Sequence, residues 1–354
     1  EMRKLSERLA LEKTVKQLGI DNAEAVRLAH MLVCETIRRR NFIDKFINNE
    51  LKPENIGEFD LGVQSFLRLY VYQTRIAKNW SKTDVKEAER IAKLGRSILG
   101  WKTLQKVEPF LGFLLTQKPA VVFEGGGDEE RVGLQTFHPT WFVRYCFKLF
   151  GRSEAIDFLE AGMQSPPTYL RLNTLKAGEK EILAKLAEEG VRTEKVEQLR
   201  YAYKVLSARQ PLARTASFRG GLFYVQDKAS CFAAEAANPQ PGMTVLDVCA
   251  APGAKTGYVA QLMQNRGVVY SIDYSRRRMA VWKSEVARMG VEIAVPVTAD
   301  ACNPLPFRVE ADLVVLDPPC TSTGTFRKLP SAKWRLTRRS VDKMAEIQWQ
   351  MINN

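Results

Sequence analysis

Histidine is scarce in this sequence, and the cysteines are scattered. The 354 residues include two histidines, His30 and His138, and six cysteines, of which no two form a Cys-x-x-Cys pair. Zinc sites and disulfide frameworks depend on such clusters, so we expect neither a metal nor a disulfide scaffold. The cysteine usage suits a reducing, cytoplasmic compartment. His138, beside Pro139 and Trp141, is more readily a structural histidine at a helix start than a catalytic base.

Long hydrophobic runs are also missing. No apolar stretch approaches the roughly 20 residues that a membrane-spanning helix needs. The sequence does not open with the charged and then apolar pattern of a secretory signal. These absences predict a protein without a membrane partner.

Acidic residues are fewer than basic ones. Lysine and arginine total 53 against 40 aspartates and glutamates, which gives a formal net charge of +13 and a pI near 9.5. Such a surplus favours a polyanionic partner, with nucleic acid as the first candidate. Composition alone fits a merely soluble basic protein equally well. The length allows two or three domains.

Residues 1–122 predict an all-helical bundle. Apolar residues recur there at helical spacing, for example over residues 63–72. The run Arg38-Arg39-Arg40 could contact phosphates, although a solvated helix face is the simpler interpretation. The glycine-rich stretch 123–137 is expected to be a solvated linker that ends this domain.

Residues 138–235 predict a small α+β module. Residues 168–173 alternate like a strand, and a helix pattern and further strand patterns follow. Arg171, Lys176 and Arg200 give the module some potential to face RNA.

From residue 236 onward, strand patterns alternate with helix patterns. Four apolar runs, at 244–248, 268–272, 293–297 and 313–316, lead to a turn or an acidic residue. This alternation is typical of a parallel sheet wrapped by helices, as in an α/β Rossmann-like domain. The last run has four consecutive aliphatic residues, which predicts a strand buried on both faces.

The turn after the first of these strands does not match the common nucleotide-binding loops. It reads Cys249-Ala-Ala-Pro-Gly-Ala-Lys255, and its small residues would let a cofactor approach the backbone. A dinucleotide loop requires Gly-x-Gly-x-x-Gly, and a P-loop requires a leading glycine before Lys255-Thr256. A nicotinamide-dependent enzyme is therefore disfavoured.

An aspartate follows each of the next three strands, at Asp273, Asp300 and Asp317. Ligands of open parallel sheets bind at the carboxyl ends of the strands, so these residues define a candidate crevice. Asp273 lies about 20 residues beyond the turn, where an acidic side chain commonly binds a ribose diol. A site for adenosine with no phosphate to neutralise suits S-adenosylmethionine.

Together these motifs resemble RNA (cytosine-5)-methyltransferases of the Nol/Nop/Sun type. The cofactor turn, the strand-end aspartates and Asp317-Pro318-Pro319-Cys320 carry the resemblance, and segments at 138–141, 166–173 and 225–230 strengthen it. The first domain is similar to the NusB-like RNA-binding domain of the Sun/Fmu branch. The resemblance implies a multidomain chain: an all-α NusB-like bundle (1–122), a linker (123–137), a small α+β, RRM-like module (138–235) and an α/β class I methyltransferase domain (236–354).

The family's motifs imply roles for individual residues. The implied cofactor-binding residues are Cys249, Ala250, Ala251, Pro252, Gly253, Ala254, Lys255, Asp273, Asp300 and Asp317. The implied catalytic residues are Cys320, Asp317 and Lys255. Carbon 5 of cytosine is a poor nucleophile, so a thiolate must first add to carbon 6. Methyltransferases that act on exocyclic amines resemble Asp-Pro-Pro-Tyr instead, and the alternative for Cys320 itself is a small buried residue.

The implied substrate is an unpaired or extruded cytosine in RNA, with ribosomal RNA ahead of transfer RNA. Basic residues after the catalytic loop could pair with phosphates, while Phe326 and Trp334 could stack on bases. The predicted RNA-binding residues are Arg327, Lys328, Lys333, Arg335, Arg338 and Arg339. Packing of Trp334 against the core is an equally good interpretation.

Two features depart from the family pattern. The family attacks the base with a cysteine in a later Thr-Cys-Ser segment and uses the Asp-Pro-Pro-Cys cysteine to assist product release. The sequence ends at Asn354 before such a segment, so we expect a C-terminally incomplete domain in which Cys320 either assists release or attacks. Ala254 stands where the family usually has glycine, which should narrow the cofactor loop slightly. We expect a monomer, and the alternatives are an amino-group methyltransferase and a non-catalytic RNA-binding or ribosome-assembly factor.

Overall fold

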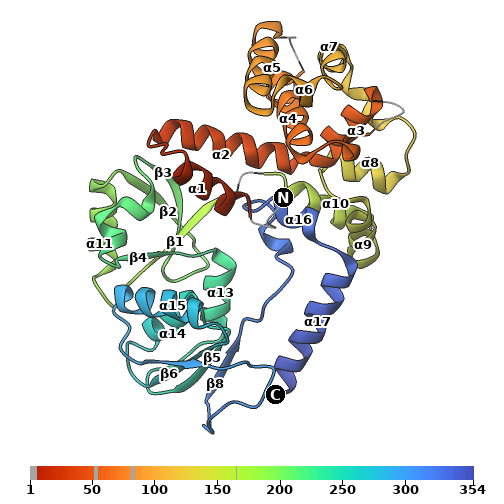
Figure 1. The fold of residues 1–354 in the computed structure, drawn as a ribbon. Coiled ribbons are helices and arrows are strands. Elements are labelled where there is room, and N and C mark those ends of the chain that lie inside the picture. The colour runs from red at the N-terminus through yellow and green to blue at the C-terminus, as the bar shows by residue number, and fades with distance from the viewer. Residues whose placement is uncertain (1–5, 52–54, 81–83, 165) are drawn as a thin grey trace. The chain divides into compact units, whose positions relative to one another are not determined.

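The computed structural model describes residues 6–51, 55–80, 84–164 and 166–354 (Figure 1). The chain divides into two compact units. The helical unit comprises residues 1–165 and 322–336, and the α/β unit comprises residues 166–321 and 337–354. The chain therefore crosses between the units after residues 165, 321 and 336.

The helical unit is built from short, capped helices. Its elements are α1 (Glu7–Gln17), α2 (Ala23–Arg38), α3 (Arg40–Glu50), η1 (Ile56–Glu58), α4 (Leu61–Val71), η2 (Tyr72–Ile76), α5 (Val85–Leu99), α6 (Trp101–Leu104), α7 (Glu108–Thr116), η3 (Pro119–Phe123), α8 (Asp128–Gln135), α9 (Thr140–Phe150), α10 (Arg152–Ala161), η5 (Thr323–Thr325) and α16 (Ser331–Arg335). Side chains of Ser6, Asn22 and Asp84 accept backbone N–H hydrogen bonds at the starts of α1, α2 and α5. Such caps satisfy donors that a helix start leaves unpaired.

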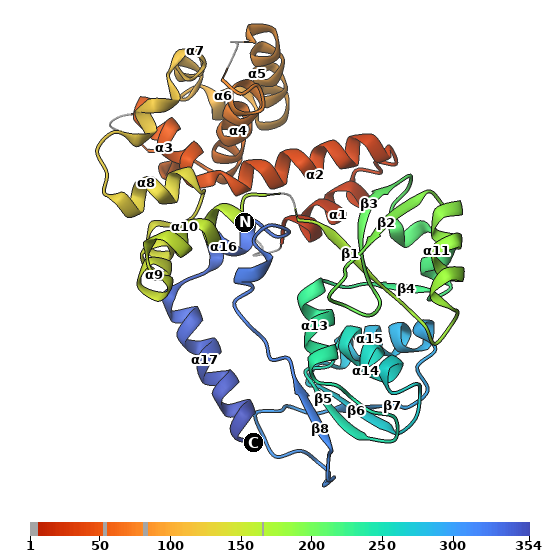
Figure 2. The same cartoon turned by 180° about the vertical axis from the view of Figure 1, so that it is seen from behind.

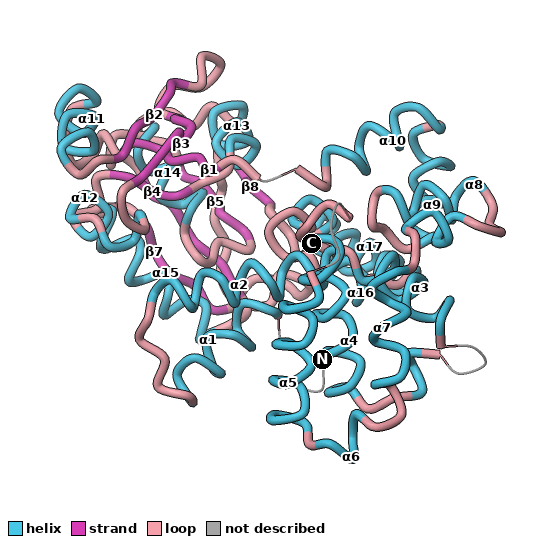
Figure 3. Tube along the Cα trace, turned by 90° about the horizontal axis from the view of Figure 1, so that it is seen from above, coloured by secondary structure: helices cyan, strands magenta, loops and turns pink. Residues whose placement is uncertain are grey.

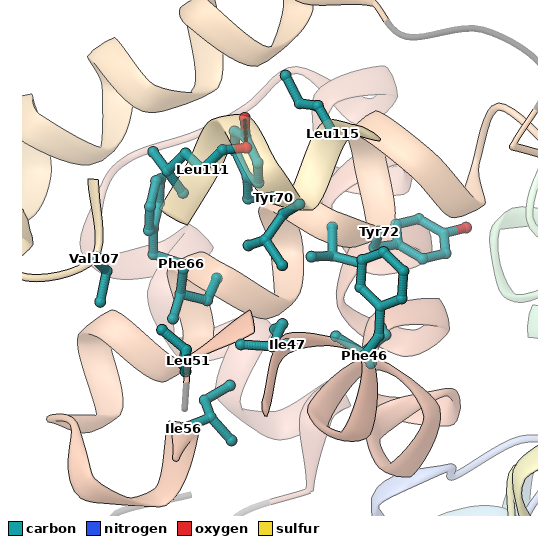
Figure 4. Close-up of a cluster of buried hydrophobic side chains, with 14 of the residues drawn as sticks. Phe46, Ile47, Leu51, Ile56, Phe66, Tyr70, Tyr72, Val107, Leu111 and Leu115 are labelled. Carbon is teal, nitrogen blue, oxygen red and sulfur yellow. Dashed lines mark hydrogen bonds between the residues drawn. The ribbon is translucent and has the colours of Figure 1, made fainter. Parts of the chain in front are cut away.

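Aromatic and aliphatic side chains fill the core of the helical unit. Phe46 and Ile47 of α3, Tyr70 of α4 and Leu111 of α7 belong to one buried cluster, drawn in Figure 4. The Tyr70 hydroxyl donates a hydrogen bond to the Leu111 carbonyl oxygen at 3.1 Å. This bond satisfies the polar group that the tyrosine brings into the core. The predicted helical first domain is confirmed.

The stretch expected to be a solvated linker is largely helical. Residues 128–135 form α8, in which Val132 and Leu134 are buried. Lys45 Nζ also pairs with Glu130 Oε1 at 2.5 Å, which ties α8 to α3. Burial of these two aliphatic side chains stabilises α8, whereas the conformational freedom of the preceding glycines opposes an ordered backbone. The helical unit therefore continues through this stretch to α10.

A small antiparallel sheet begins the α/β unit. Its strands are β1 (Thr168–Leu172), β2 (Val191–Lys195), β3 (Ala202–Ala208) and β4 (Phe223–Val225), in the order β2-β3-β1-β4, with α11 (Glu179–Glu188), η4 (Leu212–Arg214) and α12 (Ala216–Arg219) between them. Leu170 and Leu172 of β1 pack against Ile182 and Leu186 of α11. The α+β module is thus confirmed, with a core between one sheet face and its helix.

Arg171 lies on the opposite face of β1 and is buried, so its predicted exposure to RNA is wrong. Its Nε donates to Gln226 Oε1 at 2.8 Å, and its guanidinium carbon lies 4.6 Å from the Tyr258 ring centroid. Tyr258 belongs to α14 (Ala254–Leu262), so this face of the small sheet packs on the methyltransferase core. A buried arginine requires such hydrogen bonds and ring contacts to offset its lost hydration.

The second sheet of the α/β unit is parallel. Its strands are β5 (Thr244–Val248), β6 (Val268–Asp273), β7 (Ala294–Thr298) and β8 (Leu313–Leu316), in the order β7-β6-β5-β8, and its helices are α13 (Lys228–Ala236), α14, α15 (Arg276–Met289) and α17 (Arg338–Asn353). Figures 1 and 2 show α14 and α15 on the same side of this sheet. Val248 and Ile272 form a cluster on the other face, against which Met351 of α17 packs. The predicted Rossmann-like arrangement is confirmed.

One detail of this sheet differs from the sequence expectation. β8 is the last strand in the described order, and Val314 is 56% exposed. Four aliphatic residues in a row therefore do not lie in a strand covered on both faces. Figure 3 shows the strands and helices of both sheets by colour. None of the helices in the described part of the chain is long and apolar enough to span a bilayer.

The helical core should respond to loss of volume. Leu67 is fully buried in α4, so Leu67→Ala should lower the free energy of unfolding by about 2–5 kcal/mol. Leu94→Ala, at a half-exposed position of α5, should cost far less. Urea unfolding followed by circular dichroism measures both, and equal losses would contradict this packing.

Candidate active site

The turn between β5 and α14, residues 249–253, forms a tight loop of small side chains, called here the cofactor loop. Cys249 has a φ of +66° and Gly253 a φ of +110°, both in the left-handed region. A Cβ atom on Gly253 would lie 3.2 Å from Trp282 Cδ1. Glycine therefore suits this position for both conformation and space. Ala254 is the first residue of α14, so its methyl group lies at the start of the helix.

A buried hydrogen-bond network clamps the two ends of the cofactor loop. Thr256 Oγ1 donates to Asp247 Oδ2 at 2.5 Å and accepts from Trp282 Nε1 at 2.9 Å. Ser271 Oγ lies 3.4 Å from the same hydroxyl. Asp247 lies in β5, Thr256 in α14 and Trp282 in α15, so three elements meet at one hydroxyl group.

Among the carboxylates of this region, Asp247 has the most strongly shifted pKa. Burial raises its pKa to about 7, although the hydrogen bond from Thr256 and the charge of Lys255 act in the opposite direction. Its Oδ1 is buried and has no hydrogen-bond partner among the described residues. Asp247, Thr256 and Trp282 are not among the site residues predicted from the sequence. The spacing of Asp247 and Thr256 around a small-residue turn was the available signal.

Asp273 is buried at the end of β6 and lies against the cofactor loop. Its Oδ2 accepts from Ala251 N and faces Arg278 Nη1, both at 3.3 Å, while Oδ1 accepts from Ser275 N at 3.0 Å. Arg278 also donates to the Ala251 carbonyl oxygen. In this structure Asp273 therefore holds the loop, and its binding of a ribose stays a prediction.

The other two strand-end aspartates are exposed. Asp300 Oδ1 accepts from Cys302 N at 3.0 Å in the turn after β7. Asp317 Oδ2 receives Lys255 Nζ at 2.5 Å, and Asp317 N donates to the Val248 carbonyl oxygen at 3.2 Å. The structure thus brings Lys255 and Asp317 into contact, beside the strand that leads to the cofactor loop.

Cys320 is exposed, which does not fit a small buried residue. The two prolines before it cannot donate backbone hydrogen bonds and restrict their φ angles. The Pro319 carbonyl oxygen accepts from Gln348 Nε2 of α17 at 2.8 Å. The thiol is therefore presented on a stiff turn at the end of β8.

Lys333 is only 2% exposed, and this burial contradicts its predicted contact with phosphate. Its Nζ donates to the Phe137 carbonyl oxygen at 2.5 Å. Burial, with the nearby charges of Arg38 and Arg39, lowers its pKa to about 7. A lysine so enclosed lies away from a solvated RNA backbone.

The aromatic residues of the same stretch also pack inward. Phe326 is buried beside His138 and Phe142, so stacking on a base is not available to it. Trp334 Nε1 donates to the Ile37 carbonyl oxygen at 2.6 Å, which favours the packing interpretation. Burial lowers the pKa of His138 to about 3, and its ring lies against Thr136 Oγ1, as expected of a structural histidine.

The remaining predicted RNA-binding residues differ in exposure. Arg327 is half-buried, and its Nε donates to the Gln164 carbonyl oxygen at 3.1 Å. The exposed members are Lys328, Arg335, Arg338 and Arg339. No group of three or more metal-ligand side chains occurs within the described residues.

The residues around the cofactor loop suit a nucleoside cofactor without phosphates. A loop of small side chains, carboxylates at neighbouring strand ends and the orphaned Asp247 Oδ1 are all present in the α/β unit. Hydroxyl and ammonium groups are natural partners for these oxygens. S-adenosylmethionine carries both kinds of group.

Comparison with known proteins agrees with this geometry. A family model described as 16S rRNA methyltransferase RsmB/F matches residues 234–354, and the ferredoxin-like domain of RsmF/B-like methyltransferases matches residues 138–210. A Bacillus subtilis protein named as a probable ribosomal RNA small subunit methyltransferase B is 30% identical over 91% of this chain and 71% of its own length. The 25S rRNA (cytosine-C(5))-methyltransferase nop2 of Schizosaccharomyces pombe is 32% identical over 58% of this chain and 34% of its own. The crystal structure of PH0851 superposes with a TM-score of 0.74 and 27% identity, covering 97% of this chain and 76% of that one.

The clamp on the cofactor loop should matter for cofactor binding. Thr256→Val removes the hydroxyl that joins Asp247 to Trp282 at nearly constant volume. Without these hydrogen bonds the ordered cofactor loop should lose about 1.4 kcal/mol of stabilisation, which would weaken S-adenosylmethionine binding roughly tenfold. Titration calorimetry measures this. Thr14→Val, on the exposed surface of α1, is the matched control, and equal affinities in both variants would contradict the role of the clamp.

Asp247 should also give the fold a distinctive pH dependence. Its pKa is raised from 3.8 to about 7, so the native state holds a proton that the unfolded state releases. The resulting stability is fully present below about pH 4 and is lost as pH rises through 7. Asp247→Asn cannot titrate, so the difference in unfolding free energy between variant and wild type should change between pH 4 and pH 7.5. Urea unfolding measures both free energies, and a difference that stays constant across that range would contradict a raised pKa for Asp247.

Proposed function

Because the chain belongs to the RsmB/F family of rRNA methyltransferases, we propose that it methylates carbon 5 of a cytosine in ribosomal RNA. The observation that carries the proposal is the Asp317-Pro318-Pro319-Cys320 turn, which presents an exposed thiol beside the Lys255–Asp317 ion pair. Proteins that methylate exocyclic amines need no thiol at this position. Relatives named for cytosine carbon-5 methylation of rRNA support the same reaction.

The methyl donor is S-adenosylmethionine, which supplies an electrophilic methyl group when it is bound. We assign its binding to the cofactor loop with Lys255 and to the strand-end residues Asp273, Asp300 and Asp317. The Asp247–Thr256–Trp282 network keeps the loop in place. Arg278 and Asp273 hold its middle through Ala251.

The reaction at cytosine requires a nucleophile from the protein. A thiolate adds to carbon 6, which makes carbon 5 electron-rich enough to accept the methyl group. A base then takes the carbon-5 proton, the electron pair of that C–H bond re-forms the double bond between carbons 5 and 6, and the pair of the sulfur–carbon bond returns to sulfur as the thiolate. Asp317 is assigned to the amino and ring nitrogens of the base, with Lys255 holding its carboxylate in position. Cys320 is assigned to the release step, as the family resemblance implies.

The RNA must present its cytosine outside a helix, because the reacting ring carbons are enclosed in a stacked duplex. Exposed Lys328, Arg335, Arg338 and Arg339 are the candidates for phosphate contacts, and Lys333 is withdrawn from that set. Ribosomal RNA is preferred over transfer RNA because the relatives reported above carry rRNA in their names.

Cys320→Ala tests the role of the thiol. If Cys320 assists release, the variant in the full protein should lose turnover and accumulate a protein–RNA adduct that survives a denaturing gel. Cys302→Ala is the matched control, since that half-buried cysteine has no assigned role. Radiolabelled methyl transfer and mass mapping of the modified base complete the measurement.

The outcomes separate the alternatives. Loss of both turnover and adduct would assign the attack to Cys320 rather than release. A methyl group mapped to the exocyclic nitrogen would identify an amino-group methyltransferase. Binding of RNA and S-adenosylmethionine without any methylation by the unaltered protein would leave a non-catalytic RNA-binding factor.

A further inference from the structure

Two polar side chains at the end of β1, Arg171 and the next residue but one, Asn173, are completely buried within the α/β unit. Each is 0% exposed. Side chains alternate between the faces of a strand, so both point away from the face that packs on α11. Figures 1 and 2 show α14 and α15 between this small sheet and the parallel sheet. The two side chains therefore face the helices that hold the cofactor loop.

Arg171 is bonded to the second half of α14. Its Nη1 donates to Gln261 Oε1, and its guanidinium carbon lies 4.6 Å from the Tyr258 ring centroid. Gln261 Nε2 in turn donates to the Leu172 carbonyl oxygen at 3.0 Å. A planar guanidinium suits this place because it donates hydrogen bonds at its edge while an aromatic ring lies against its face. Directional contacts, as well as packing, therefore join β1 to α14.

Asn173 is bonded to the end of α15. Its Nδ2 donates to the Met289 carbonyl oxygen and to the Gly221 carbonyl oxygen, both at 2.8 Å. The Met289 carbonyl is one of those that a helix end leaves without an intrahelical donor. Gly221 has a φ of +74°, and a Cβ atom there would lie 2.0 Å from the Arg288 carbonyl oxygen. The backbone before β4 thus approaches the end of α15 as closely as only a glycine allows.

We infer that Arg171 and Asn173 are positioning residues, which set the spacing of α14 and α15. That spacing decides whether the clamp between Thr256 and Trp282 stays closed. Thr256 Oγ1 and Trp282 Nε1 lie 2.9 Å apart. Such a hydrogen bond is lost beyond about 3.5 Å, so a relative shift of the helices by roughly half an ångström opens it. The inference rests on the proposed function only in taking S-adenosylmethionine as the ligand of the cofactor loop.

The anchoring residues lie close enough to the clamp for the helices to transmit their position. At a rise of about 1.5 Å per residue, Gln261 lies about 7.5 Å along α14 from Thr256, and Met289 lies about 10 Å along α15 from Trp282. Sharp kinks in helices occur at prolines and bulges, and neither interrupts these two stretches. The small sheet thus acts as a bracket for cofactor binding, a role separate from any contact of its own with RNA.

A role confined to core packing makes a different prediction. Replacing a buried charged group by an apolar side chain of similar volume often leaves stability unchanged or higher, because the cost of desolvation is removed. If Arg171 only fills space, Arg171→Met should keep both the fold and the affinity for S-adenosylmethionine. If it positions α14, the same change should weaken cofactor binding, whatever its effect on stability.

The experiment measures the clamp directly in Arg171→Met and Asn173→Leu. In the protein without cofactor, exchange of the Trp282 indole hydrogen should accelerate about tenfold in both variants, as followed by NMR of isotope-labelled tryptophan. Calorimetric titration with S-adenosylmethionine should give a dissociation constant raised by about tenfold. Arg192→Met, at an exposed position of β2 in the same sheet, is the matched control and should change neither value.

A double-mutant cycle separates positioning from a general loss of order. Thr256→Val already removes the hydroxyl of the clamp, so adding Arg171→Met should weaken S-adenosylmethionine binding by no more than about twofold further. Fully additive losses of affinity would overturn the inference. An unchanged indole exchange rate in a folded Arg171→Met protein would overturn it as well.

Asn173→Leu carries the same test if Arg171→Met fails to fold. Failure of both variants to fold would overturn the inference in favour of a purely structural role. If the unaltered protein does not bind S-adenosylmethionine, the cofactor assignment of the proposed function fails. The exchange of the Trp282 indole hydrogen still decides in that case whether the two residues hold the clamp.

Discussion

The hydrogen bond between Thr256 and Asp247 is the contact on which the candidate site depends. It joins β5, just before the cofactor loop, to the helix that follows, so the two segments that flank the loop are held together. Trp282 of α15 also donates a hydrogen bond to Thr256 through its indole nitrogen, and its ring fills the space beside Gly253. A loop of small residues has few side-chain contacts of its own, and such a backbone is costly to order. The clamp supplies that order from outside the loop, which leaves the small residues available to a cofactor.

The basic surplus of the chain is only partly a surface property. Arg171 packs on Tyr258 inside the α/β unit, and Lys333 is enclosed near Arg38 and Arg39 in the helical unit. Burial disfavours the charged form in both cases, and it lowers the pKa of Arg171 to about 10 and of Lys333 to about 7. Counting lysines and arginines therefore overstates the charge available to a polyanion. RNA contacts should be sought among the exposed residues alone.

The sequence predicted the structure best where a motif determines both the local secondary structure and the chemistry of its side chains. The four parallel strands and the turn after β5 follow from alternating patterns, and the rule that parallel strands end at one edge gathers the strand-end residues there. The ion pair of Lys255 with Asp317, two residues that the family resemblance places in one site, was not itself predicted. Prediction was weakest where the partner of a side chain lies far along the chain. Lys333 meets the carbonyl oxygen of Phe137, almost two hundred positions earlier, and a basic run looks the same whether it is solvated or enclosed. The α8 helix was missed because glycines before it suggested a linker, while its burial depends on tertiary contacts.

The catalytic turn, Asp317-Pro318-Pro319-Cys320, is restrained near both of its ends by contacts within the α/β unit. On its N-terminal side, Asp317 is tied to Val248 by a backbone hydrogen bond and to Lys255 by an ion pair. Near its C-terminal end, the Pro319 carbonyl oxygen accepts a hydrogen bond from Gln348 Nε2 of α17 at 2.8 Å. Methylation of cytosine through a thiolate adduct requires the sulfur to come within bonding distance of carbon 6. The sulfur must then be released from that carbon. A short turn held at both ends, with stiff prolines between, keeps the sulfur within a small volume and avoids a large ordering cost at each turnover.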